Sequence, residues 1–271
     1  MILIILSLGG NTMIHTKRPT PKGRLRRAGG LLLIIVLLLA GFPAYNRLKS
    51  EIPLSVPEQS EPHQNEAGPD DTISLVSVPY ISQENLLPTG CELVSAVMLL
   101  RFEGSTASVH DFADAIPKGE IITQGNRKLG PDPHDVFVGD PYSSSGYGCY
   151  APVIADTLNT FLPEGRKAVA DENLSLPELA RRCEEEGLPA LIWATMNMEP
   201  SRPGTCWVLP SGNEFQWISR EHCLVLLGAD DSCYYFNDPY QSHGRIAYDR
   251  EVVEQRYREL GSQSVIVIDA K

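Results

Sequence analysis

The sequence lacks the short motifs of several large classes of enzymes and binding proteins. It contains no phosphate-binding P-loop, no dinucleotide-binding fingerprint and no HExxH zinc motif, and no segment repeats along its 271 residues. These absences argue against a nucleotide-dependent enzyme, an HExxH metalloprotease and a repeat scaffold. We therefore expect no cofactor and no catalytic metal. Six cysteines are also too few for a protein of this length to be held together by disulfides.

Acidic residues are missing from residues 1–50, which carry eight lysines and arginines and no aspartate or glutamate. Since the formal net charge of the whole chain is −11, the remaining residues carry −19. An acidic main body argues against a nucleic-acid partner, because phosphates are bound by basic surfaces. The basic residues are instead interpreted as the flank of a membrane segment.

Residues 28–46 contain no charge and have LLLIIVLLLA at their centre. As a helix they would rise about 28 Å, which is just enough to cross the hydrocarbon core of a bilayer. The basic residues that precede them predict a cytoplasmic tail over 1–27 and an outward-facing C-terminal part. A cleaved signal peptide, which would make the protein secreted, is the alternative. No clear cleavage site follows Ala40, however.

Residues 47–72 are rich in Pro, Glu, Gln and Ser and poor in large apolar side chains. This composition predicts an extended, disordered linker. Residues 73–271 contain the periodic apolar segments that a packed core requires, and we expect them to form one domain and the protein to be a monomer.

The helix predicted to begin near Cys91 and to stop at Gly104 is the central element of this domain. Its residues are almost all apolar, so it should be buried on all sides. Thr89 and Glu92 form a T-x-x-E pattern, which predicts a capping box with Thr89 as N-cap and Cys91 in the first turn. The helix dipole there favours a thiolate. Cys91 is therefore a candidate nucleophile, and an inert core cysteine is the alternative.

A predicted β-hairpin brings His222 and Asp238 together. Strand-like runs flank a turn at 228–232. If the loop is centred on Asp230, the two side chains lie directly opposite each other on one face, about 4.5–5.5 Å apart at Cβ. The aspartate would then orient the imidazole and stabilise its cation. His243, in the following loop, is the weaker alternative.

The remaining segments are assigned from periodicity and from turn and cap signals. Ser175 and Glu178 form a second capping box. The long Gly/Pro/Ser-rich region at 117–147 is interpreted as an irregular functional loop or lid. We expect helices at 108–116, 151–162, 175–186 and 249–260, strands at 73–81, 189–198 and 264–269, and a hairpin at 206–219.

Other chemically reactive residues are interpreted as structural. His110 is expected at the surface, and His134 and Asp135 are expected to be ordinary loop residues. Cys149 has no predicted helix cap in front of it and should lie outside the site. Cys183 is expected to be half-buried on a charged helix.

Four segments, VPYISQ…PTGCELVSAVMLLRFEG, GYGCYAP, EHCLVLLG and NDPY, together resemble the bacteriocin-processing-like cysteine peptidases of the papain clan. The resemblance runs from about Leu75 to Ile268. The separation of 131 residues between Cys91 and His222 falls within the span expected of that architecture. The resemblance implies an α+β, papain-like fold in which a central helix bearing the cysteine packs against an antiparallel β-sheet.

The resemblance also implies a role for each site residue. Cys91 would be the nucleophile, His222 the general base and acid, and Asp238 the residue that orients the histidine. Gln83 and the backbone N–H of Cys91 would form the oxyanion hole. We therefore expect an exported, thiol-dependent hydrolase of peptide or amide bonds. The alternatives are a transpeptidase or acyltransferase that uses the same thioester, and a surface peptide-binding module without turnover.

Overall fold

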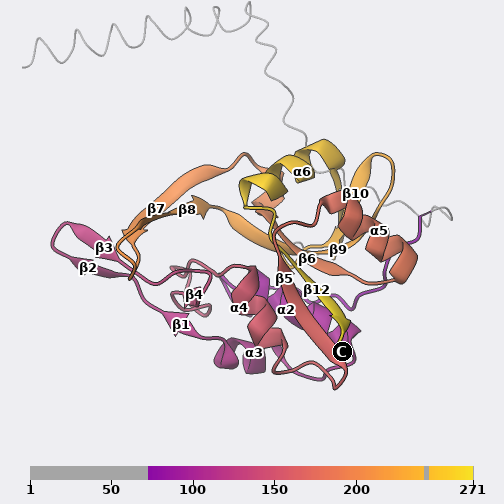
Figure 1. The fold of residues 1–271 in the computed structure, drawn as a ribbon, viewed down its shortest axis with the longest axis horizontal. Helices are drawn as coiled ribbons and strands as arrows, with labels where there is room; N and C mark the ends of the chain where they lie inside the picture. Colours follow the sequence, from indigo (N-terminus) through magenta and orange to yellow (C-terminus); the bar gives the residue numbers. More distant parts are fainter. Residues whose placement is uncertain (1–72, 241–243, 271) are drawn as a thin grey trace, which may run out of the picture. The chain divides into compact units, whose positions relative to one another are not determined.

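The computed structural model describes residues 73–240 and 244–270, which form an α+β fold (Figure 1). The predicted tail, membrane segment and linker, all within residues 1–72, and His243 lie outside the described residues. Within the described ranges, no helix combines the length and apolar character needed to cross a bilayer.

A six-stranded antiparallel sheet forms the centre of the fold, with strand order β11-β10-β9-β6-β12-β5. Strand β6 is buried along its whole length and β9 along all but its last residue, because helices cover both faces of the sheet. The strands are β5 (Arg166–Asp171), β6 (Ala190–Thr195), β9 (Glu221–Ala229), β10 (Cys233–Asn237), β11 (Arg245–Asp249) and β12 (Ser264–Asp269).

Helices lie on both sides of this sheet (Figure 1). One side carries α2 (Cys91–Phe102), α3 (Val109–Ala115) and α4 (Ala151–Leu158), and the other carries α5 (Leu176–Glu186) and α6 (Arg250–Glu259). The cysteine-bearing helix α2 packs against β9 and β6 and is buried over its first ten residues. The predicted α+β class, with this helix against an antiparallel sheet, is confirmed.

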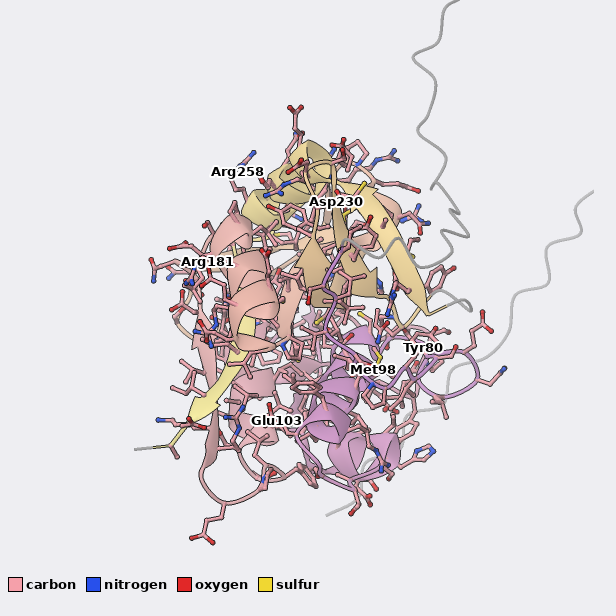
Figure 2. All side chains as sticks on the ribbon, turned by 90° about the vertical axis from the view of Figure 1, so that its right-hand side faces the viewer. Tyr80, Met98, Glu103, Arg181, Asp230 and Arg258 are labelled. Atoms are coloured by element: carbon pink, nitrogen blue, oxygen red, sulfur yellow. The ribbon has the colours of Figure 1, made fainter. Side chains whose placement is uncertain are left out.

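The helices differ in their surroundings as their sequences indicate. Met98 of α2 is fully buried, whereas Arg181 of α5 and Arg258 of α6 lie at the periphery (Figure 2).

The capping box predicted at the start of α5 is present: the Ser175 hydroxyl accepts from the backbone N–H of Glu178, and the backbone N–H of Ser175 donates to the Glu178 carboxylate at 2.9 Å.

The region 117–147 is irregular over most of its length, as its composition indicated, but four short strands interrupt it. It contains β1 (Lys118–Gly119), β2 (Ile122–Gln124), β3 (Arg127–Leu129) and β4 (Phe137–Val138). Strand β1 pairs with β4, and the β2–β3 hairpin joins β7 (Arg202–Val208) and β8 (Glu214–Ser219) in a four-stranded sheet. The prediction missed the four-stranded sheet because Leu129 of β3 pairs with Val208 of β7, about 80 residues further along the chain.

Two strand predictions also differ from the structure. Residues 73–81 form no strand, although the backbone N–H of Val76 donates to the carbonyl of Leu227 at 2.9 Å. Strand β6 ends at Thr195, and the short 3-10 turn η1 (Met196–Met198) follows it. This turn contains two residues with positive φ, Asn197 and Met198, which ends the extended conformation.

Candidate active site

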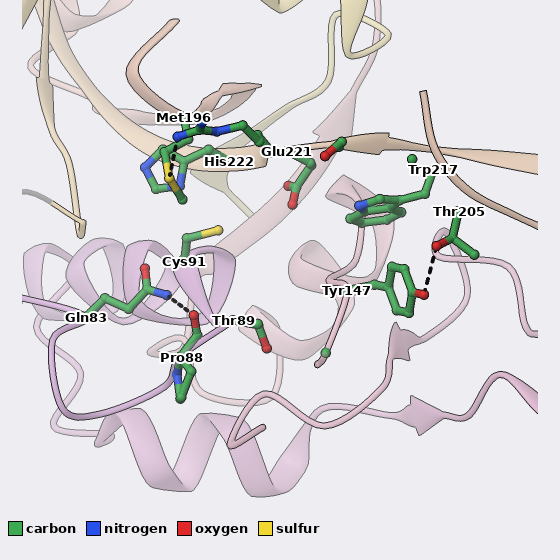
Figure 3. A pocket seen from close by; sticks show the side chains of 14 residues that line it. Gln83, Pro88, Thr89, Cys91, Tyr147, Met196, Thr205, Trp217, Glu221 and His222 are labelled. Atoms are coloured by element: carbon green, nitrogen blue, oxygen red, sulfur yellow. Dashed lines mark hydrogen bonds between the residues drawn. The ribbon is translucent and has the colours of Figure 1, made fainter. Parts of the chain in front are cut away.

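A pocket of about 300 Å³ lies at the N-terminal end of α2, where the start of β9 meets the segment before α2 (Figure 3). Cys91 and His222, 131 residues apart in the chain, both line it, as does Gln83. The remaining lining residues are Pro88, Thr89, Gly146, Tyr147, Met196, Gly204, Thr205, Trp217, Ser219, Arg220 and Glu221.

His222 and Asp238 form a buried pair. Nε2 of His222 lies 2.7 Å from Oδ1 of Asp238, and both side chains are almost completely buried. Oδ1 also accepts from the backbone N–H of Tyr240 at 2.9 Å. Because the carboxylate binds Nε2, it favours the tautomer with the proton on that nitrogen, which leaves Nδ1 as an acceptor. Nδ1 has no hydrogen-bond partner among the described residues.

The hairpin reaches this contact by a register different from the predicted one. Tyr235 pairs with Gly228 but Phe236 pairs with Leu226, so Leu227 is the extra residue of a β-bulge. Continued past the strand end, this register places Asp238 beside Leu224 and not directly opposite His222. The predicted direct opposition is therefore wrong by two residues.

The bulge nevertheless keeps the two side chains on one face. Without it, Asp238 would align with Val225, whose side chain points away from the face that carries His222. With it, Asp238 aligns with Leu224, two residues from His222, and the two side chains meet diagonally.

The predicted capping box at α2 is absent. The N-cap is Gly90, and the hydroxyl of Thr89 donates to the carbonyl of Ser143 at 3.0 Å. The Glu92 side chain turns into the interior, where Oε1 accepts from the backbone N–H of Cys149 at 2.9 Å. The tertiary partners of Thr89 and Glu92 replace the local ones that the sequence pattern predicted.

Cys91 is oriented toward Glu92. Its Sγ donates to Glu92 Oε2 at 3.2 Å, and the sulfur points sideways from the His222 ring (Figure 3). Burial, followed by the negative charges of Glu92 and Glu221, raises the pKa of the Cys91 thiol well above its usual value. The sequence-based expectation of a thiolate stabilised by the helix dipole is thus not met, because desolvation and two carboxylates outweigh the dipole.

Gln83 lies in the pocket, but its donor group is engaged elsewhere. Nε2 donates to the carbonyls of Leu87 and Pro88 at 2.8 and 3.2 Å (Figure 3). Oε1 is buried and has no partner among the described residues. The Gln83 amide, which was expected to point into the space beside the Cys91 sulfur, is therefore bound to the turn before α2.

Glu92 and Glu221 form a buried acidic pair that the sequence reasoning did not identify as part of the site. Burial raises the pKa of Glu92 to about 7. Burial and the charge of Glu92 raise the pKa of Glu221 well above its usual value. Two signals were available: Glu92 follows the candidate nucleophile in an almost wholly apolar helix, and Glu221 precedes the candidate histidine. A charged residue at a buried position of an apolar element is a functional signal.

Asp238, in contrast, has a lowered pKa. Burial alone would raise it, but the interaction with His222 and the hydrogen bonds from the Tyr240 backbone and the Tyr248 hydroxyl together lower it below the usual value. Asp238 is therefore ionised at neutral pH and can stabilise a cationic imidazole.

The remaining candidates lie outside the pocket lining. His110 is exposed and contacts the hydroxyl of Tyr142 at 3.1 Å, while His134 binds Asp132 at 2.7 Å. Cys149 is fully buried, and only its backbone N–H contacts the acidic pair. Cys183 is fully buried and not half-buried, because its thiol packs against β9 and donates to the carbonyl of Leu226.

A thiol, an imidazole with a free acceptor nitrogen and a carboxylate on the other ring nitrogen are the groups used in nucleophilic acyl transfer. The arrangement therefore has the composition of a Cys-His-Asp site.

The chain is similar to several known proteins. Residues 75–265 match the Peptidase C39 like family. The uncharacterized protein YvpB of Bacillus subtilis (strain 168) is 28% identical over 181 residues, which cover 67% of this chain and 70% of YvpB.

Two solved structures are also similar. A Bacillus anthracis protein assigned as a C39-like peptidase is 29% identical, with a TM-score of 0.66, and the match covers 73% of this chain and 98% of that protein. A double-glycine-motif protease from an AMS/PCAT transporter, solved with its leader peptide, is more distant. It is 14% identical with a TM-score of 0.41, and the match covers 73% of this chain and 96% of that one.

The family match covers more than half of the chain, and it confirms the resemblance that the sequence motifs indicated. The chain therefore belongs to the Peptidase C39 like family and has its papain-like α+β fold.

Proposed function

We propose that this protein is a thiol-dependent hydrolase that cleaves peptide or amide bonds through a thioester on Cys91. The observation that carries the proposal is the convergence of Cys91 and His222 on one pocket, with Asp238 2.7 Å from the far nitrogen of His222. Membership of a peptidase family supports the peptide or amide class of substrate.

In the proposed reaction, Nδ1 of His222 takes the thiol proton as Cys91 Sγ attacks the substrate carbonyl carbon. The C–N bond then breaks, and His222 donates the proton to the leaving amine. A water molecule, deprotonated by His222, attacks the thioester and releases the acid, and the proton returns to the thiol. Asp238 orients the imidazole and stabilises its cation throughout.

The resting geometry implies a side-chain rotation before attack. Cys91 is a protonated thiol that donates to Glu92, while Nδ1 of His222 has no partner among the described residues. Rotation about the Cα–Cβ bond of Cys91 would replace the hydrogen bond from the thiol to Glu92 by one to Nδ1 of His222. A substrate that excludes water from the pocket would favour this exchange.

The oxyanion would be bound first by the backbone N–H of Cys91. This group is the first amide of α2 and has no acceptor within the helix. Gln83 would contribute a second donor by exchanging its 3.2 Å bond to the Pro88 carbonyl for the substrate oxygen. We expect Gln83→Ala to lower the rate on the order of 100-fold, with its far-ultraviolet circular dichroism unchanged.

Labelling and product formation test the proposal directly. In separate experiments, the full-length protein is labelled with iodoacetamide or incubated with a peptide library. Labelled residues and cleavage products are identified by mass spectrometry. Cys91→Ala should abolish cleavage, His222→Ala should lower it strongly, and Cys206→Ala, which changes an exposed thiol outside the catalytic trio, should not affect it. Peptides that bind equally well to the parent and to Cys91→Ser without any product would refute the hydrolase and support the binding module.

We also propose that the folded domain lies outside the cytoplasmic membrane, on the basis of the charge pattern around residues 28–46. Cys206 is exposed and provides a reporter. A membrane-impermeant maleimide should label Cys206 in intact cells that express the full chain, in a background in which Cys91 is replaced by serine. Labelling only after lysis would refute the proposed location.

A further inference from the structure

At the proposed nucleophile, three potential metal ligands from two parts of the chain, the start of α2 and the start of β9, converge in the interior. Cys91 Sγ, one carboxylate oxygen of Glu92 and one of Glu221 lie within 4.8 Å of one another, and all three residues are buried. We propose that these side chains form an inhibitory site for one divalent cation of the zinc type, whose binding blocks the thiol.

The orientation of Glu221 is independent evidence for a ligand. This side chain is only 7% exposed, and its Oε1 is buried without a hydrogen-bond partner among the described residues. Its carboxyl group points into the pocket on the side of the Cys91 sulfur (Figure 3). An oxygen with free lone pairs and no donor is costly in the interior, and a cation would satisfy it.

Gly148 shows that the chain leaves space for the two carboxyl groups. A Cβ atom at this position would lie 2.2 Å from Glu92 Oε1 and 3.2 Å from Glu221 Oε2. The two carboxyl groups therefore approach the same point from different elements, the start of α2 and the start of β9. Any residue larger than glycine at this position would collide with them.

The arginine and the histidine of the pocket lining each already have an acidic partner. Arg220 lines the pocket but pairs with Glu199 at 2.9 Å, and Nε2 of His222 binds Asp238. Two carboxylates and a thiolate whose ligand atoms lie within 4.8 Å of one another would repel each other strongly. A divalent cation would offset that repulsion, and the thiol and carboxyl protons that it displaces would pass to solvent. Metal affinity should therefore rise with pH.

The ligand types select among cations. Calcium and magnesium bind six or more oxygens and avoid thiolates, whereas Zn²⁺ binds thiolate sulfur and carboxylate oxygen in a tetrahedral set. Three protein ligands leave a fourth position, which faces the pocket and is available to water. With its thiolate bound to the metal, Cys91 could not attack a substrate.

Cobalt(II) provides a spectroscopic probe that does not depend on turnover. We would titrate the full-length protein, carrying Cys206→Ser to remove an exposed thiol, with Co²⁺ and measure thiolate-to-cobalt charge-transfer absorption; Zn²⁺ binding would be measured by calorimetry. Cys91→Ser should abolish the charge-transfer band. Glu221→Gln and Glu92→Gln should each raise the Kd for Zn²⁺ by about 10-fold to 100-fold.

Two control variants separate this site from other metal binding. Glu214→Gln removes the same charge from an exposed carboxylate and should leave the Kd unchanged. His222→Ala should retain Zn²⁺ binding if the three ligands form the site, whereas simple Cys-His chelation would be lost in this variant.

The proposal would be overturned by the absence of a charge-transfer band in the parent protein. It would equally be overturned by binding that requires His222 but is unchanged in both glutamate variants, since that result would show simple Cys-His chelation. If one glutamine variant fails to fold, the other still decides the question. Because binding is measured without a substrate, a failure of the proposed hydrolase activity would not affect this result.

Discussion

Replacing Glu92 by glutamine should make Cys91 more reactive toward alkylating agents near neutral pH. The Glu92 carboxylate accepts a hydrogen bond from the Cys91 thiol at 3.2 Å and disfavours the thiolate by its charge. Glutamine keeps the shape of the side chain and a carbonyl acceptor, and it removes only the charge. Burial and Glu221 still raise the pKa of Cys91 in this variant, so the change isolates one contribution.

The expected magnitude follows from the distance. Two unit charges 3.2 Å apart interact by about 5 kcal/mol at an effective dielectric constant of about 20. Removing this charge lowers the pKa of the thiol and so increases the fraction of thiolate. On a logarithmic scale, roughly half of that increase is offset, because a less basic thiolate is a weaker nucleophile. The remaining effect is about 100-fold in rate, as an upper bound. Since the pKa of Glu92 is about 7, part of this carboxyl is already neutral near pH 7, so we expect an increase of at least about tenfold at pH 8.

The assay is the rate of iodoacetamide alkylation of the peptide that contains Cys91, followed by mass spectrometry. A chelator is included so that bound metal does not protect the thiol. Glu221→Gln should act in the same direction, and Glu214→Gln, which removes an exposed charge, should have no effect. An equal or slower rate in Glu92→Gln would show that the carboxylate does not control the ionisation of Cys91.

Three further predictions concern Asp238, Glu92 and Gly148. Asp238→Asn should lower kcat on the order of 1,000-fold to 10,000-fold because an amide does not stabilise the required tautomer and cation, while Asp231→Asn, an exposed neighbour, should not change kcat. The pKa of Glu92 is raised from 4.5 to about 7, so its stabilising contribution is present at low pH and is lost as pH rises. The free energy of unfolding, measured with urea, should therefore fall by up to about 3 kcal/mol between pH 4.5 and 7, and an equally steep fall in Glu92→Gln would contradict this. Gly148→Ala should lower Tm more than Gly165→Ala, because both have positive φ but only the first Cβ meets other atoms, and equal losses would refute the close approach.

Local sequence patterns predicted the elements that depend on neighbouring residues. The apolar run after Cys91 predicted a helix buried on all sides, and α2 is buried over its first ten residues. The Ser175–Glu178 pattern predicted a capping box that is present, because both partners lie within one turn at the surface and meet no competing contact. Strands β9 and β10 were recognised from their apolar residues on either side of a turn.

The same kind of pattern failed at Glu92, where the surroundings differ. Its carboxylate lies in the interior, and the backbone N–H of Cys149 and the thiol of Cys91 bind it in place of a cap. The prediction missed the strands within 117–147 for a related reason, since the β2–β3 hairpin joins the sheet through β7, far along the chain. Local propensity cannot reveal which partner a distant segment will supply.

The sequence alone thus determined which residue types were available for the site: a cysteine at a helix start, a histidine before an apolar strand and an aspartate after the next strand. The tertiary structure decided how they are used. The bulge at Leu227 places Asp238 on the face of His222, because side chains alternate along a strand and one extra residue reverses the face. The fold also brings Glu221 to Glu92 and Cys91 in an interior that excludes water. The charge state of the thiol therefore depends first on burial and then on the carboxyl groups of Glu92 and Glu221. Glu221 lies 130 residues further along the chain, and no local pattern encodes its approach.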